Sequence, residues 1–222
     1  MVSVVLGIDT ATDVRVGLAR DGSVLASEAF ESTRAHAEQL LPLVQQVMAT
    51  SGVAFSELTA VHVGVGPGPF TGLRVGVAAA ITLAEVLGIE VRGVCSLDVV
   101  AAQWAGTGLS DEFVVVADAR RSEVYWARYS ADGIRREGPF VSAPGEVPDL
   151  ALAGPGAQLT GRPVGGPALI DAGLLAASDA LPAVGTEPLY LRRPDATVPT
   201  TRKSTLAQPR IAMMVAEPPE AP

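Results

Sequence analysis

Residues 61–77 read VHVGVGPGPFTGLRVGV and join a buried-strand pattern to a glycine-proline turn and then to a helix rich in small residues. Glycine has no side chain and permits positive φ, while Pro67 and Pro69 stiffen the turn. The pattern therefore indicates that another group comes close to this backbone or to the helix that follows it. The residues alone leave open whether that group is a phosphate or a protein surface.

Strand and helix patterns extend from this stretch in both directions. The expected elements are strands at 3–8, 14–19 and 23–29, a helix at 36–50, a strand at 60–65, a helix at 71–87, a strand at 89–94 and a helix at 96–104. Three antiparallel strands followed by βαβ crossovers predict a mixed α/β sheet with helices on both faces. This is the arrangement of a ribonuclease H-like lobe.

A second and shorter copy of the pattern begins at residue 113. Asp118 ends its first strand where Asp9 ends the first strand of the chain, and the counterpart of the first helix is missing. We therefore expect a first lobe at 1–104 and a second, truncated lobe at 105–192. Residues 193–222 are rich in Pro, Thr and charge, a composition typical of a mobile tail.

The composition limits the classes of function. Of the 222 residues 48% are hydrophobic and only 5% aromatic, and the net charge of −8 argues against binding of a polyanion by this chain alone. Cys95 is the single cysteine, which excludes an intrachain disulfide. The chain starts without a basic leader, and no apolar run is expected to approach the ~18–20 residues of a membrane span. We expect a cytoplasmic protein.

Short motifs spread along the chain together resemble the TsaB (YeaZ) family. The resemblance covers roughly residues 3–130 and 187–192. Its motifs are GIDTAT at 7–12, HAEQLLP at 36–42, GPGPFTGLRVG at 66–76, DAR at 118–120, EVYWA at 123–127 and EPLYLR at 187–192.

The resemblance implies a fold, a function and a set of partners. The fold is two ribonuclease H-like lobes of the actin, hexokinase and heat-shock ATPase class, with mixed sheets flanked by helices and a reduced second lobe. The implied function is that of a non-catalytic subunit that supports the catalytic subunit TsaD, with the ATPase TsaE, when a threonylcarbamoyl group is added to the adenosine beside the anticodon of tRNA. The chain is expected to reach tRNA only through this complex and to be able to form a homodimer when alone. No cofactor is expected on the chain alone, and ATP or ADP with magnesium belongs to the assembled complex.

The helix after the glycine-proline turn carries the predicted partner interface. Gly72, Gly76 and Ala80 recur every four residues and form a smooth stripe that a second helix can approach. The alternative is that this stripe packs on the chain's own sheet. The full predicted interface is His36, Leu40, Phe70, Gly72, Leu73, Arg74, Gly76, Val77 and Ala80, with Phe70 and Arg74 as anchors.

The ends of the two first strands are the predicted nucleotide-proximal positions. They comprise Asp9, Thr10, Thr12 and Asp118. If both ends bound a nucleotide, the chain would be an autonomous ATPase or small-molecule kinase, which is the alternative function. Arg120 and Arg121 stand where a phosphate-binding loop favours glycine. His36 and His62 lie far apart in the sequence, so no metal site is expected.

Overall fold

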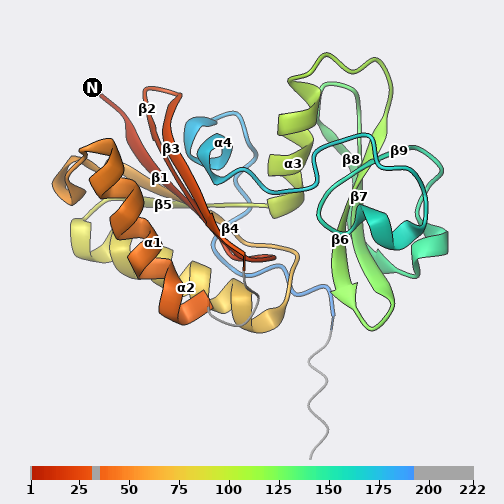
Figure 1. The fold of residues 1–222 in the computed structure, drawn as a ribbon, viewed down its shortest axis with the longest axis horizontal. Helices are drawn as coiled ribbons and strands as arrows, with labels where there is room; N and C mark the ends of the chain where they lie inside the picture. The colour runs from red at the N-terminus through yellow and green to blue at the C-terminus, as the bar shows by residue number, and fades with distance from the viewer. Residues whose placement is uncertain (1, 32–35, 193–222) are drawn as a thin grey trace, which may run out of the picture. The chain divides into compact units, whose positions relative to one another are not determined.

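Two mixed β-sheets organise the chain, and the computed structural model describes residues 2–31 and 36–192 (Figure 1). The first sheet contains β1 (Val4–Asp9), β2 (Val14–Arg20), β3 (Ser23–Phe30), β4 (Ala60–Gly64) and β5 (Glu90–Val94), in the order β3-β2-β1-β4-β5. The second contains β6 (Phe113–Arg120), β7 (Glu123–Tyr129), β8 (Arg135–Ser142) and β9 (Ala151–Ala153), in the order β8-β7-β6-β9. In each sheet three antiparallel strands meet a parallel fourth strand. This shared order confirms the expected pair of ribonuclease H-like lobes. The expected tail at 193–222 lies outside the described residues.

Helices cover both faces of the first sheet. They are α1 (His36–Ser51), α2 (Phe70–Leu87) and α4 (Ala172–Ala177), whereas α3 (Ser96–Ala105) packs against the second sheet. Leu6 and Ile8 of β1 share one buried cluster with residues of α1 and α2, whereas Val5 shares another with Ala176 of α4. Successive strand residues point to opposite faces, so α1 and α2 lie on one face of the sheet and α4 on the other.

Two paired glycines allow α4 to lie directly on the first sheet. Gly7 of β1 is opposite Gly17 of β2 in the antiparallel register. A Cβ atom added at either glycine would lie 2.4 or 2.3 Å from the carbonyl oxygen of Ala172. The ring nitrogen Nδ1 of His62 in β4 donates to the carbonyl oxygen of Leu175 at 2.9 Å. The sequence places the segment that contains α4 in the second lobe, but it packs against the first sheet.

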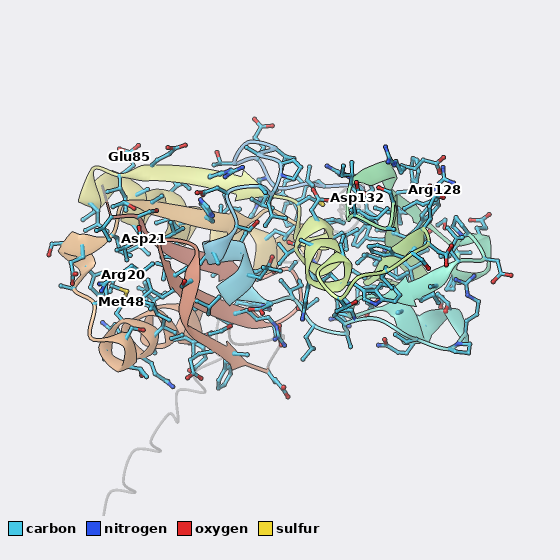
Figure 2. The ribbon with its side chains drawn as sticks, turned by 90° about the horizontal axis from the view of Figure 1, so that it is seen from above. Arg20, Asp21, Met48, Glu85, Arg128 and Asp132 are labelled. Carbon is cyan, nitrogen blue, oxygen red and sulfur yellow. The ribbon has the colours of Figure 1, made fainter. Side chains whose placement is uncertain are left out.

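The second sheet has its own aromatic core and fewer helices. Trp104 of α3 packs on Phe113 with ring centroids 4.8 Å apart, and Phe113 stacks on Tyr129 at 5.6 Å. Between β8 and β9 the chain forms only a short 3₁₀ turn, η2 (Pro144–Glu146), where the first lobe has α1. The second lobe is therefore reduced, as expected. Figure 2 shows Arg128 and Asp132 among its elements, with Arg20, Asp21 and Met48 among those of the first lobe.

One helix of the described residues, α2, is long and apolar enough by length and composition alone to cross a membrane. It has 18 residues with a mean hydropathy of 1.6, and a third of it is buried inside the chain. This corrects the expectation that no segment approaches such a length. Its six buried residues are Gly72, Leu73, Gly76, Val77, Ala80 and Ala84.

Candidate functional site

The glycine-proline turn and the start of α2 pack against Thr10 and Ala11, the two residues that follow β1. A Cβ atom added at Gly68 would be 2.6 Å from the carbonyl oxygen of Ala11, and one at Gly72 would be 2.6 Å from that of Thr10. One added at Gly76 would be 2.2 Å from the Thr10 hydroxyl oxygen. The close approach that the sequence predicts is therefore made by residues 10 and 11 of the same chain.

Hydrogen bonds fix this contact from both sides. The Thr10 hydroxyl donates to the carbonyl oxygen of Gly72 at 2.8 Å. The Ser96 hydroxyl donates to Oδ2 of Asp9 at 2.6 Å and accepts from the Gly66 N–H at 3.1 Å. These bonds join the end of β1, the glycine-proline turn and the starts of α2 and α3.

Asp9 is enclosed by these groups. It is 1% exposed, and its Oδ1 accepts from the Ala11 N–H at 2.8 Å. Burial raises the pKa of Asp9 to about 6, while the hydrogen bonds from Ser96 and Ala11 act in the opposite direction. A Cβ atom at Gly64 would lie only 1.7 Å from Oδ2, so that glycine is needed to leave room for the carboxylate. Asp9 thus serves as a buried acceptor within the fold.

The other predicted nucleotide-proximal residues are also buried or make contacts with residues of the same chain. Thr10 is fully buried, and the Thr12 hydroxyl donates to Asp13 at 2.8 Å. Asp118 accepts from the Arg120 N–H at 2.6 Å and pairs with the Arg120 guanidinium at 3.2 Å. Asp118 lines a cavity of about 440 Å³ whose other lining residues are Arg120, Arg121, Ser122, Glu123, Pro144 and Leu159. That lining does not include Asp9, so the two aspartates do not share this cavity.

Most of the predicted partner interface is buried inside the chain. The residues concerned are His36, Leu40, Gly72, Leu73, Gly76, Val77 and Ala80. The interpretation of the glycine stripe as a partner-facing surface is therefore wrong. A helix face of small residues indicates that another group packs closely on it. Here that group is Thr10, which directly follows β1.

Phe70 and Arg74 are the two predicted interface residues that reach the surface. Phe70 is 40% exposed, and the guanidinium carbon of Arg74 lies 3.8 Å from the centre of its ring. The Arg74 Nε donates to the hydroxyl of Tyr190 at 3.0 Å. Sequence reasoning missed Tyr190, although it lies in the EPLYLR motif at 187–192.

The histidines sit on different elements. His36 is buried at the start of α1 with no hydrogen-bond partner for Nε2 among the described residues, and His62 is buried in β4. Burial lowers the pKa of His62. In the part of the chain that the structure describes, no group of three or more His, Cys, Asp or Glu residues could hold a metal ion.

Comparisons with known proteins give a TsaD family model and relatives of the TsaB (YeaZ) family. Residues 24–158 match the family model described as TsaD, tRNA N6-adenosine threonylcarbamoyltransferase. An uncharacterized protein of Mycobacterium tuberculosis is 48% identical over 205 residues, covering 88% of this chain and 94% of the relative. The tRNA threonylcarbamoyladenosine biosynthesis protein TsaB of Escherichia coli is 40% identical over 131 residues, covering 58% of this chain and 55% of that protein. The structure of YeaZ from Pseudomonas aeruginosa is 30% identical with a TM-score of 0.65, covering 78% of this chain and 89% of that one.

Proposed function

Because the chain belongs to the TsaB (YeaZ) family, within the wider family described as tRNA N6-adenosine threonylcarbamoyltransferase, we propose that it acts in tRNA threonylcarbamoyladenosine biosynthesis as a non-catalytic subunit. Its role is to bind the catalytic subunit TsaD and to hold it in an active conformation. TsaE joins the assembled complex. The chain reaches tRNA through that complex, because a net charge of −8 opposes binding to RNA phosphates.

The observation that carries the non-catalytic role is the enclosure of Asp9. Both of its carboxylate oxygens accept hydrogen bonds from the chain, and the glycine-proline turn is packed on Ala11 through Gly68. A magnesium-nucleotide site needs an accessible carboxylate and open backbone N–H groups. The residues at the end of β1 do not fit that requirement. ATP or ADP with magnesium is therefore assigned to the assembled complex.

We propose the exposed start of α2 as the partner-facing surface. Phe70 and Arg74 lie there, and aromatic and arginine side chains are enriched in protein interfaces. The same surface is available for a homodimer when TsaD is absent. We expect both forms in the cytoplasm.

Coexpression with the TsaD homologue of the same genome tests the proposal. The two chains should elute together in size-exclusion chromatography. With TsaE and an activated threonylcarbamoyl donor supplied, the mixture should transfer the group from that donor to tRNA faster than TsaD does without this chain. The isolated chain should be inactive. Separate elution, with no effect on the rate, would remove the proposal.

Calorimetry with magnesium ATP separates this function from the autonomous ATPase. The isolated chain should give no binding heat at micromolar concentrations. Micromolar binding that disappears in Asp9→Asn would favour the ATPase instead. Asp111→Asn is the matched control, since Asp111 is an exposed carboxylate that accepts only from Ser110 among the hydrogen bonds of the described residues.

A further inference from the structure

Two aromatic side chains hold Arg74 in one position. Its guanidinium carbon lies 3.8 Å from the ring centre of Phe70 and 5.9 Å from that of Tyr190. The two rings are themselves in contact, with centroids 4.7 Å apart and a tilt of 36°. With the hydrogen bond from Nε to the Tyr190 hydroxyl, the guanidinium is fixed along one face and one edge. We call Phe70, Arg74 and Tyr190 the Arg74 cluster.

The segment that carries Tyr190 is attached to both lobes. The Leu189 N–H donates to the carbonyl oxygen of Val65 at 2.8 Å, beside the glycine-proline turn. Arg192 donates to the carbonyl oxygen of Ala119 at 2.9 Å and pairs with Glu123 at 2.7 Å. In Figure 1 this segment, in blue, runs toward the ends of β6 and β7. Because Tyr190 is fixed on either side, the Arg74 cluster is formed before any partner arrives, which lowers the entropy cost of binding.

The outer edge of the Arg74 guanidinium is unoccupied among the described residues. No hydrogen bond or ion pair there involves its Nη1 or Nη2. Arg20 and Arg128 differ, since Arg20 pairs with Glu57 at 3.1 Å and Arg128 with Glu137 at 2.6 Å. A guanidinium whose Nη atoms have no partner can offer two N–H groups to a carboxylate in bidentate geometry.

Resting on the proposed function, we infer that the Arg74 cluster binds a carboxylate of the protein partner, an Asp or Glu side chain on the catalytic subunit. The surroundings favour a protein over an RNA phosphate. Phe70 and Tyr190 are 40% and 41% exposed and give the cluster an apolar rim, which suits the desolvated centre of a protein interface. The net charge of the chain, −8, opposes an RNA backbone.

The affinity of the full chain for the TsaD homologue, measured by calorimetry at fixed salt, tests this assignment. Arg74→Lys keeps the charge but loses the planar fork, and it should weaken binding about tenfold. Tyr190→Phe keeps the ring but removes the hydroxyl that orients Nε, and it should weaken binding about threefold. Arg20→Lys is the matched control and should bind as the wild type does. Thermal unfolding of each variant shows whether the fold is retained.

The outcomes distinguish a failure of the proposed function from a failure of the carboxylate assignment. If the wild-type chain does not bind TsaD, the proposed function fails. If the wild type binds and Arg74→Lys binds equally well, the carboxylate assignment fails while the proposed function stands. If Arg74→Lys binds TsaD normally but loses affinity for an anticodon stem-loop RNA, the cluster recognises phosphate and the inference is overturned.

Discussion

The hydroxyl of Ser96 donates a 2.6 Å hydrogen bond to Oδ2 of Asp9 and thereby joins the first residue of α3 to the last residue of β1. The same hydroxyl oxygen accepts from the Gly66 N–H at 3.1 Å. Both Ser96 and Asp9 are almost completely buried, so neither group can be replaced by water without rearrangement. Ser96 therefore links the end of β1, the glycine-proline turn and the start of α3 through buried hydrogen bonds.

Ser96→Ala should lower the free energy of unfolding by about 1–3 kcal/mol. The substitution removes the donor to Asp9 and leaves the Gly66 N–H without its acceptor. Urea denaturation measures the loss. Ser110→Ala is the control, because Ser110 is exposed and donates only to Asp111 among the described hydrogen bonds. Equal losses in the two variants would contradict a special role for Ser96.

The stability of Asp9→Asn, compared with that of the wild type at the same pH, should increase as the pH rises. The pKa of Asp9 is raised from 3.8 to about 6 in the folded chain, so the folded state holds the proton more tightly than the unfolded state. The contribution of Asp9 to stability is therefore complete below pH ~4 and is lost as the pH rises through 6, a total of about 3 kcal/mol. Asparagine does not titrate, so the substitution removes this loss.

The measurement is the difference in unfolding free energy between Asp9→Asn and the wild type at pH 4, 5, 6 and 7. The difference should move in favour of the variant across this range, and Asp111→Asn is the control for the loss of one carboxylate. His62, whose pKa is lowered by burial, titrates equally in both proteins and cancels in the difference. A flat difference would show that Asp9 is not protonated in the folded state near pH 5.

Gly76→Ala should destabilise the chain by about 1–3 kcal/mol, although alanine is the better helix former. The added methyl group would lie 2.2 Å from the Thr10 hydroxyl oxygen, which itself donates to Gly72. Thermal unfolding measures the effect. Ala78→Leu adds a larger group on the exposed face of the same helix and should change stability by less than about 0.5 kcal/mol. If the two variants unfold at the same temperature, the packing of α2 on Thr10 is not tight.

The architecture could be predicted from the sequence because its signals are local and repeated. Alternation at 14–19 and the 3.6 period at 36–50 identify β2 and α1, and the second appearance of a strand ending in aspartate, at Asp118, identifies the second sheet. The glycine stripe correctly predicts a place of close packing. What packs there could not be predicted, because glycine spacing records the distance of approach and carries no mark of the neighbour's identity.

Long-range contacts could not be predicted either, because they leave no pattern in the local sequence. The helix α4 has six residues, AGLLAA, which are too few to show a helical period and give no sign of which sheet they cover. Tyr190 and Arg74 are 116 residues apart in sequence and meet only in the folded chain. Their contact depends on the backbone hydrogen bond between the Leu189 N–H and the Val65 carbonyl oxygen. A backbone hydrogen bond leaves no pattern in the side chains.

Gly17→Ala should detach α4 from the first sheet. The new methyl group would lie 2.3 Å from the backbone of Ala172, and a helix of six residues cannot shift without losing its contacts on β1 and β2. Amide hydrogen exchange should become faster in α4, and the unfolding free energy should fall by about 2 kcal/mol. Gly145→Ala is the control, because a Cβ atom there meets nothing within 4 Å. Unchanged exchange in α4 would contradict the role of the paired glycines.

Ser122→Gly should stabilise the chain by about 0.5–1 kcal/mol. Arg121 and Ser122 form the β6–β7 turn with φ values of 54° and 62°, a left-handed conformation that a Cβ atom makes costly. The corresponding turn between β2 and β3 uses Asp21 at 50° and then Gly22 at 76°. The reverse change, Gly22→Ser, should therefore destabilise by a similar amount. Thermal unfolding of both variants checks the pair, and a lower melting temperature for Ser122→Gly would mean that the Ser122 side chain makes a contact whose value exceeds the backbone strain.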